Sequence, residues 1–201
     1  MTKEFNVLIT GVGGQGVILM SELLGKSAVK EGLKVRGSEV LGMAVRGGSV
    51  TSSIRIGDDV YGPLIPTGKC TALVGMEPSE ALRNIGSLSK SSLVIVNTTA
   101  TVPFTVSVGE STYPAMEQVL EKLNKAAGKI VKLDATKLAE EAGSRLAANI
   151  VMLGALFGSE QLPIKTATIK ETIEERFPAK AAPVNIKAFE LGYEACRKAL
   201  K

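Results

Sequence analysis

The sequence lacks several residue types on which enzymes commonly depend. Its 201 residues include no histidine, no tryptophan, only two cysteines and 4% aromatic residues. Without histidine, the chain cannot supply a His-based general acid, a Ser–His or Cys–His nucleophile pair, or His ligands for zinc or haem. Two cysteines, Cys70 and Cys196, cannot hold a four-thiolate iron–sulfur cluster or form a disulfide framework. We therefore expect no catalytic residue and no metal site in this chain.

The residues that are present are typical of a globular protein. The chain is 45% hydrophobic and 22% charged, with 24 basic and 20 acidic residues and a net charge of +4. The basic residues are scattered, which favours a mixed solvated surface over a nucleic-acid interface. The uncharged stretches are too short or too polar for a membrane span, and no signal peptide is visible. We expect one domain over residues 1–201, cytoplasmic, with free thiols and with no membrane or nucleic-acid partner.

Hydrophobic periodicity predicts strands that alternate with helices. The first forty residues show a buried strand (5–10), a glycine loop, a helix (16–31) and a short strand (33–36), which together predict a Rossmann-like βαβ unit. Further strands are expected at 49–56, 60–65, 71–75, 93–97, 104–108 and 129–133. Further helices are expected at 78–85, 113–127, 136–142, 145–157, 166–177 and 184–200. This alternation favours a three-layer α/β/α fold, in which a mostly parallel sheet is covered on both faces.

A glycine-rich loop, Gly11–Gly16, follows the first predicted strand and opens the first predicted helix. It fits the pattern G-x-G-x-x-G in the context that a dinucleotide-binding turn requires. We assign the tight turn to Gly11, backbone approach to a phosphate to Gly13, and close packing of the helix on the strand to Gly16. The candidate ligand-binding residues are Gly11, Gly13, Gly14, Gln15 and Gly16, and the free amides of the helix start favour an anion.

The rest of the dinucleotide fingerprint is incomplete. An acidic residue is expected about 20 positions further on, where it would hold the ribose, but this place is taken by Arg36, Gly37 and Ser38. Glu39 is close, but we expect it in the following loop. Arg36 would suit the 2′-phosphate of NADP. Three interpretations remain open: a nucleotide site, a site for another anion or ligand, and a tight turn that binds nothing.

Residues 39–49 form a second informative segment, with one arginine beside two glycines. Paired glycines allow a backbone to run close to a partner, and arginine offers a planar fork for a carboxylate or phosphate. The residues alone support a binding loop and a solvated surface loop equally. Further along, Glu77 follows a strand end, where it could contact a ligand or start a helix. The candidate contact residues of the second segment are Glu39, Met43, Arg46, Gly47, Gly48 and Ser49.

Several segments extend the pattern of the two glycine loops along nearly the whole chain. They are residues 11–17, 38–50, 62–66, 77–83, 96–98, 147–149 and 175–178. Together these segments resemble the gamma-type subunits of 2-oxoacid:ferredoxin oxidoreductases, and the indolepyruvate-type chains most of all. The paired glycine loops in this order are specific to that resemblance, whereas either loop alone would not be.

The resemblance implies a division of labour between chains. In this family a partner chain binds thiamine diphosphate, and partner chains or domains carry [4Fe–4S] clusters. The complex converts a 2-oxoacid, here indolepyruvate or a similar acid, into an acyl-CoA and CO2, and reduces ferredoxin. This chain would then be a non-catalytic subunit without a cofactor of its own. Its loops Gly11–Gly16 and Glu39–Ser49 would meet at the carboxyl end of the sheet and face the catalytic partner, with Arg46 making an ionic contact.

Two other functions stay open. A free-standing NADP-binding reductase is supported by the first glycine loop and Arg36, although no proton-donor pair and no substrate domain are visible. A nucleotide-binding or purely structural module is the third possibility. If the chain is a subunit, its exposed partner surface is expected to promote self-association when the chain is isolated.

Overall fold

The computed structural model describes residues 3–103, 106 and 108–201, and a six-stranded sheet forms its centre. In the described part, the strand order is β2-β3-β1-β4-β5-β6. Strands β1, β4, β5 and β6 are parallel neighbours, whereas β3 is antiparallel to both β1 and β2. The bounds are β1 (Phe5–Val12), β2 (Val35–Leu41), β3 (Ser49–Ile56), β4 (Ala72–Gly75), β5 (Leu93–Asn97) and β6 (Lys129–Leu133).

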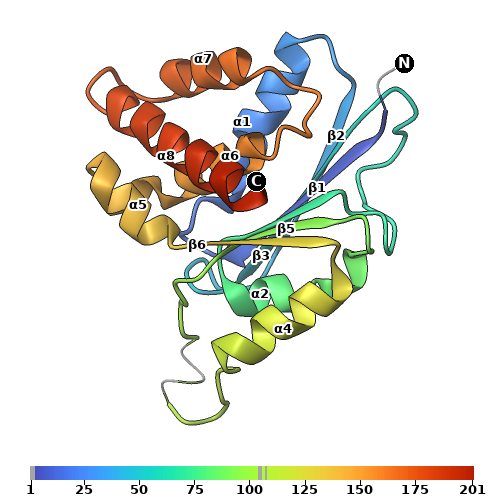
Figure 1. Ribbon diagram of the computed structural model, residues 1–201, viewed down its shortest axis with the longest axis vertical. Helices are drawn as coiled ribbons and strands as arrows, with labels where there is room; N and C mark the ends of the chain where they lie inside the picture. Colours follow the sequence, from blue (N-terminus) through green and yellow to red (C-terminus); the bar gives the residue numbers. More distant parts are fainter. Residues whose placement is uncertain (1–2, 104–105, 107) are drawn as a thin grey trace.

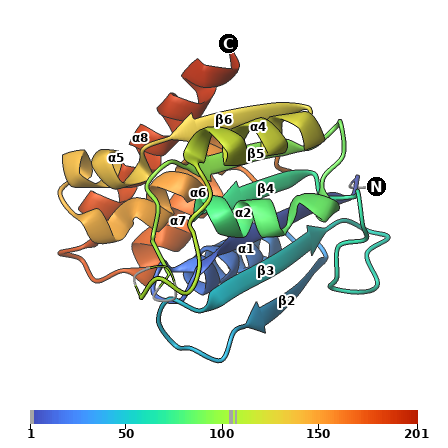
Figure 2. The same ribbon diagram turned by 90° about the horizontal axis from the view of Figure 1, so that it is seen from below.

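Helices cover both faces of this sheet (Figure 1). One face carries α1 (Val17–Lys30), α5 (Ala135–Ala142), α6 (Ala148–Gly158), α7 (Thr166–Arg176) and α8 (Ala182–Leu200). The other face carries α2 (Pro78–Arg83) and α4 (Met116–Ala126), and short 3-10 helices lie at Ile85–Ser87 and Arg145–Ala147. Figure 2 shows the sheet between the two helical layers. The predicted three-layer α/β/α fold with a mostly parallel sheet is confirmed.

The core has two parts because alternate residues of a strand point to opposite faces. In β1, which is buried along its whole length, Val7 and Ile9 belong to the larger cluster under α1, α6 and α8. Leu8 belongs to the smaller cluster, which includes Val119 and Leu123 of α4. Helix α6 is buried on almost every side, since it is held between the sheet and α8. None of the described helices is long and apolar enough to cross a lipid bilayer.

The structure corrects the predicted βαβ start. β2 runs in the same direction as β1 but is not its neighbour, because β3 inserts antiparallel between them. Pairing with β3 extends β2 as far as Leu41, so Glu39 lies in the strand and not in the following loop.

Two weaker strand predictions have different outcomes. Residues 60–65 are fully described and form a loop, so this prediction was wrong. Arg55 holds that loop, because its Nη1 donates to the carbonyls of Gly62 at 2.9 Å and Leu64 at 3.1 Å. The predicted strand at 104–108 falls largely outside the described residues.

Candidate functional site

The two glycine-containing loops pack against each other at the carboxyl edge of the sheet. Gly13 N donates to Gly48 O at 2.8 Å, and Gly47 N donates to Gly13 O at 3.1 Å. Gly42 N donates to Ser49 O at 2.8 Å and closes the base of the β2–β3 loop, which we define as residues 42–48. The two loops were expected to meet at this edge, and they do so through direct backbone hydrogen bonds.

The tight turn of the first loop lies later than predicted. Gly11 sits inside β1, opposite Val50 of β3, and the left-handed residues are Gly14 (φ 98°) and Gly16 (φ 79°). A Cβ on Gly11 would lie 2.7 Å from the Oε1 atom of Gln15. That oxygen accepts a hydrogen bond from Val12 N at 2.8 Å, so Gln15 folds back over the strand. Gly11 therefore makes room for the Gln15 side chain instead of making the turn.

Gly13 also has a different role from the one predicted. A Cβ on Gly13 would lie only 2.3 Å from the carbonyl oxygen of Val45 in the β2–β3 loop. In a dinucleotide-binding turn, this glycine leaves room for the pyrophosphate to approach. Here the chain's own loop occupies that space, and the Gly13 amide already donates to Gly48. The glycine pattern is therefore used to dock a loop of the same chain.

The start of α1 leaves hydrogen-bond donors uncapped. Its N-cap residue is Gly16, which has no side chain, and the first turn contains no acidic residue. Gly16 also lies against Asn149 of α6, whose Nδ2 would be 2.3 Å from a Cβ at this position. Gly16 therefore allows close packing against another helix, and not of α1 on the strand as predicted. Amide groups at a helix start favour negative charge, which keeps the first loop a candidate anion site.

Arg46 lies beside this helix start. Its side chain is exposed and has no hydrogen bond or ion pair to any described residue. Its Nη1 atom is 3.8 Å from the position that a Cβ on Gly14 would take. An arginine without a partner, next to uncapped amides, can bind a carboxylate or phosphate from outside the chain.

Large apolar side chains surround the same loops. Met43 and Val45 are 106% and 90% exposed, and Leu41 is 58% exposed. A groove of about 440 Å³ lies between the β2–β3 loop and the start of α1, with Ile18 and Val12 among its lining residues. An apolar patch of this kind on a soluble protein is typical of a protein-interaction surface.

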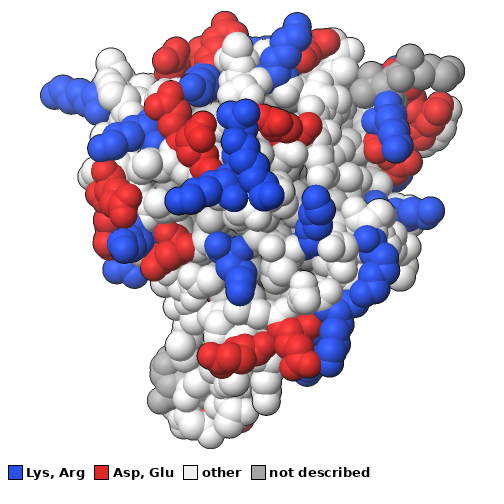
Figure 3. All heavy atoms as spheres, viewed as in Figure 1, with Lys and Arg blue, Asp and Glu red and all other residues white. Residues whose placement is uncertain are grey.

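The segment after β5 extends this surface. The described residues of the stretch 98–103, 106 and 108–115 lie at the protruding tip at the bottom of Figure 1, and few of the atoms shown there as described in Figure 3 belong to charged side chains. Over the helical face in the same view, basic and acidic side chains are interspersed. Thr101 connects the tip to the first glycine loop, because its Oγ1 accepts from Gln15 Nε2 at 3.1 Å.

Two glutamates lie buried under the edge. Glu77 is fully buried and caps α2, since its Oε2 accepts from Glu80 N at 3.0 Å. Its Oε1 accepts from Thr101 N at 3.4 Å and from the hydroxyl of Tyr113. Burial, and then the hydrogen bond to Glu77, raise the pKa of Tyr113. Glu77 thus acts as a helix-start residue, one of the two roles that the sequence allowed.

Glu80 was not identified from the sequence. It is 4% exposed, and its Oε2 accepts from Ser49 Oγ at 2.6 Å. Its other oxygen lies 3.2 Å from Nε of Arg83. The signal that could have identified Glu80 was the pair of acidic residues around Pro78. Acidic residues are favoured at the start of a helix, and in α2 Glu77 is the N-cap residue while Glu80 lies in the first turn.

The Glu39 side chain and the two cysteines lie away from the exposed surface of the loops. Glu39 turns toward α1, where its Oε1 accepts from Ser21 Oγ at 3.2 Å. Cys70 and Cys196 are buried in different apolar clusters, and burial raises the pKa of Cys70 to about 12 and that of Cys196 to about 11. No group of three or more possible metal ligands occurs among the residues that the structure describes. Because the two thiols lie in different apolar clusters, they cannot ligate one iron–sulfur cluster together.

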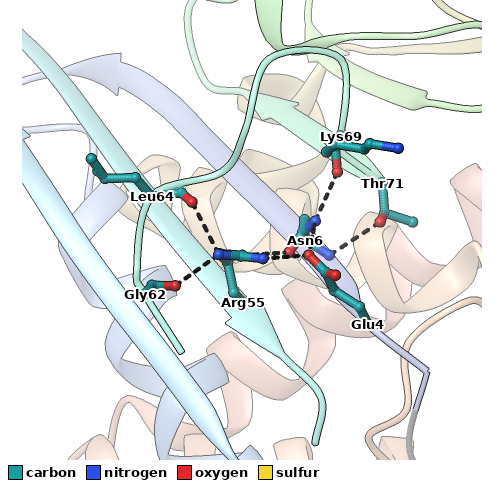
Figure 4. Close-up of polar contacts among 7 residues, drawn as sticks. All are labelled: Glu4, Asn6, Arg55, Gly62, Leu64, Lys69 and Thr71. Carbon is teal, nitrogen blue, oxygen red and sulfur yellow. Dashed lines mark hydrogen bonds and ion pairs between the residues drawn. The ribbon is translucent and has the colours of Figure 1, made fainter. Parts of the chain in front are cut away.

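The opposite, amino edge of the sheet has a different character (Figure 4). Arg55 of β3 donates to Glu4 Oε1 at 2.5 Å and to Asn6 Oδ1 at 3.0 Å, in addition to its two loop carbonyls. Asn6 Nδ2 in turn donates to Lys69 O at 2.8 Å. The hydrogen bond from Arg55, followed by that from Asn6, lowers the pKa of Glu4. At this edge, Arg55 and Glu4 therefore find their partners within the same chain.

Comparison with known proteins settles the family. The sequence pattern of the family described as pyruvate ferredoxin/flavodoxin oxidoreductase matches residues 6–195. The chain belongs to this family. It is 45% identical to the indolepyruvate oxidoreductase subunit IorB of Pyrococcus horikoshii, with 98% of each chain covered. It is 31% identical to the pyruvate/ketoisovalerate oxidoreductases common subunit gamma of Thermococcus kodakarensis, with 90% of each chain covered.

Two solved structures of oxidoreductases share the fold. The pyruvate oxidoreductase subunit PORC of Thermotoga maritima is 25% identical and superimposes with a TM-score of 0.73 over 96% of this chain and 97% of that one. The 2-oxoglutarate:ferredoxin oxidoreductase of Magnetococcus marinus gives a TM-score of 0.74 at 17% identity, and this chain covers 32% of its length. The resemblance to gamma-type subunits is confirmed, and the chain is an oxidoreductase subunit of this family.

Proposed function

We propose that this chain is the non-catalytic subunit of a thiamine-diphosphate-dependent 2-oxoacid:ferredoxin oxidoreductase that acts on indolepyruvate or a similar oxoacid. The names and full-length coverage of its relatives support this assignment. The complex would form acyl-CoA and CO2 and pass electrons to ferredoxin. Thiamine diphosphate, the [4Fe–4S] clusters and CoA would bind to the complex outside this chain, which we treat as one cytoplasmic domain over residues 1–201.

One observation carries the proposed role of the chain within the complex. Hydrogen bonds hold the two loops together at the carboxyl edge, and apolar side chains lie there around Arg46, which has no partner among the described residues. We propose that this docking edge, defined as residues 13–18 and 41–48, faces the thiamine-bearing catalytic chain. Met43 and Val45 would be buried by the partner, and Arg46 would bind one of its anionic groups. The same exposed edge would promote self-association of the isolated chain.

The free-standing NADP-binding reductase is the competing function. It requires a phosphate to approach Gly13, but the carbonyl of Val45 occupies that position. Binding of the cofactor would therefore require the β2–β3 loop to leave its two hydrogen bonds with Gly13. A nucleotide-binding module faces the same obstacle.

Two measurements test the proposal. A tagged chain from a native extract should retain a larger chain that contains thiamine diphosphate and iron–sulfur clusters, and the captured complex should show CoA-dependent oxidation of indolepyruvate. Titration of the isolated chain with NADPH should show no binding at micromolar concentration. Micromolar affinity for NADPH, together with the absence of a thiamine-containing partner, would contradict the proposal. So would an Arg46→Ala variant that left both assembly and CoA-dependent turnover unchanged.

A further inference from the structure

The buried carboxylate of Glu80 accepts a hydrogen bond from the residue at the base of the β2–β3 loop. Ser49 is the first residue of β3 and directly follows this loop, and its hydroxyl donates to Glu80 Oε2 at 2.6 Å. The backbone of Ser49 also accepts from Gly42 N at 2.8 Å. The two ends of the loop therefore meet at the residue that Glu80 holds.

Glu80 is itself held in place. Its backbone amide donates to Glu77 Oε2 at 3.0 Å, and Glu77 is fully buried. The carbonyl of Glu80 accepts from Asn84 Nδ2 at 2.9 Å. Its side chain has an exposed fraction of only 6%, whereas that of Arg83, its ion-pair partner, is 68% exposed. The anchor of Ser49 is thus a rigid buried group, while the contact with Arg83 reaches solvent and contributes little.

The loop above this anchor has little else to restrain it. Its glycines, Gly42, Gly47 and Gly48, allow many backbone conformations, and residues 42–47 are exposed. Its backbone also makes two hydrogen bonds to Gly13. A loop that is ordered before binding loses less conformational entropy when a partner docks.

We infer that Glu80 is a positioning residue, which acts through Ser49 to hold the β2–β3 loop in its docking conformation before the catalytic chain binds. The inference rests on the proposed function, because it needs this edge to be the docking surface. Glu80 touches neither substrate nor cofactor, so its loss should change the concentration of this chain needed to activate the partner. It should not change the turnover of the assembled complex.

The test is a reconstitution titration, in which the purified catalytic chain is activated with increasing amounts of each full-length variant. Glu80→Leu should raise the concentration for half-maximal activity about five- to tenfold, the effect of one partly buried hydrogen bond, while kcat at saturation stays the same. Ser49→Ala should give a similar shift, and the double variant should be no worse than Glu80→Leu alone, because both remove the same contact. Glu80→Gln keeps an acceptor for the serine hydroxyl and should behave like the unchanged chain.

A matched control separates positioning from general stability. Thr172 is 2% exposed on α7 and bonds to Ser27 Oγ at 3.0 Å, on the helical face away from α2. Thr172→Val should lower Tm without shifting the half-maximal concentration. The inference is overturned if Glu80→Leu lowers Tm but leaves that concentration unchanged, or if the effects of Ser49→Ala and Glu80→Leu add. A Met43→Asp variant then distinguishes two failures. If it does not weaken assembly either, the proposed function fails as well. If Met43→Asp does weaken assembly, only the role of Glu80 is lost.

Discussion

The arginines at the two edges of the sheet differ in whether they have hydrogen-bond partners within the chain. At the amino edge, Arg55 donates to Glu4, Asn6 and two loop carbonyls, so its hydrogen bonds are made within the chain. At the carboxyl edge, Arg46 has no partner among the described residues, and Met43 and Val45 are exposed. This difference supports our proposal that another chain completes the carboxyl edge, while the amino edge stabilises the subunit itself.

The largest expected effect is on assembly. Met43→Asp places a charge at the most exposed apolar side chain of the docking edge, and we expect the affinity for the catalytic chain to fall about 30-fold or more, as for an interface hot spot. Leu64→Asp is the matched control, since Leu64 is an apolar residue that is 65% exposed on the loop held by Arg55. Equal losses of affinity in the two variants would remove the distinction between the edges.

The next effect is on stability and belongs to the amino edge. Arg55→Ala leaves Asn6 Oδ1 and the carbonyls of Gly62 and Leu64 without their donor. We expect a loss of about 2 kcal/mol in the free energy of unfolding, with unchanged affinity for the catalytic chain. Urea denaturation and a binding titration check the two parts separately. A weakened complex with normal stability would contradict the assignment of this edge.

Alanine substitutions at two glycines, one in the first glycine loop and one in α1, separate an effect on partner affinity from an effect on stability. An alanine at Gly13 would place its Cβ 2.3 Å from Val45 O, so the β2–β3 loop must move, and we expect about a tenfold loss of partner affinity. Gly25 lies in α1, and a Cβ there meets no atom within 4 Å. Gly25→Ala should therefore stabilise the chain by about 0.5–1 kcal/mol and leave affinity unchanged. Thermal unfolding and the same binding titration measure both.

The smallest effect is a dependence of stability on pH. The folded chain lowers the pKa of Glu4 below its ordinary value of 4.5, mainly through the hydrogen bond from Arg55. A lowered folded-state pKa contributes stability above the unfolded-state pKa, and this is lost as the pH falls through the folded-state value. Glu4→Gln should therefore have a lower Tm than the unchanged chain at pH 7, and the two Tm values should approach each other below pH 4.5. A constant difference would show that Glu4 acts without its charge.

The sequence predicted the fold better than it predicted the site. Buried runs such as Leu93–Asn97 are recognisable from composition, and the structure has that strand at the predicted residues. The insertion of β3 between β1 and β2 could not be predicted, because strand order depends on contacts between distant segments. The meeting of segment 39–49 with the first glycine loop was predicted, but the approach of the Val45 carbonyl to Gly13 was not, since G-x-G-x-x-G carries no information on what fills the space it creates. Glu80 was missed because its partner Ser49 is 31 residues away.

Hydrogen–deuterium exchange of this chain, alone and in complex with its catalytic partner, tests directly whether the partner docks at the carboxyl edge. Exchange reports the protection of individual backbone amides, so it distinguishes the two edges within one experiment. Partner binding should protect the amides of residues 13–18 and 41–48 and leave those of residues 55–71 unchanged. Protection of residues 55–71 with no change at the two glycine loops would contradict docking at the carboxyl edge.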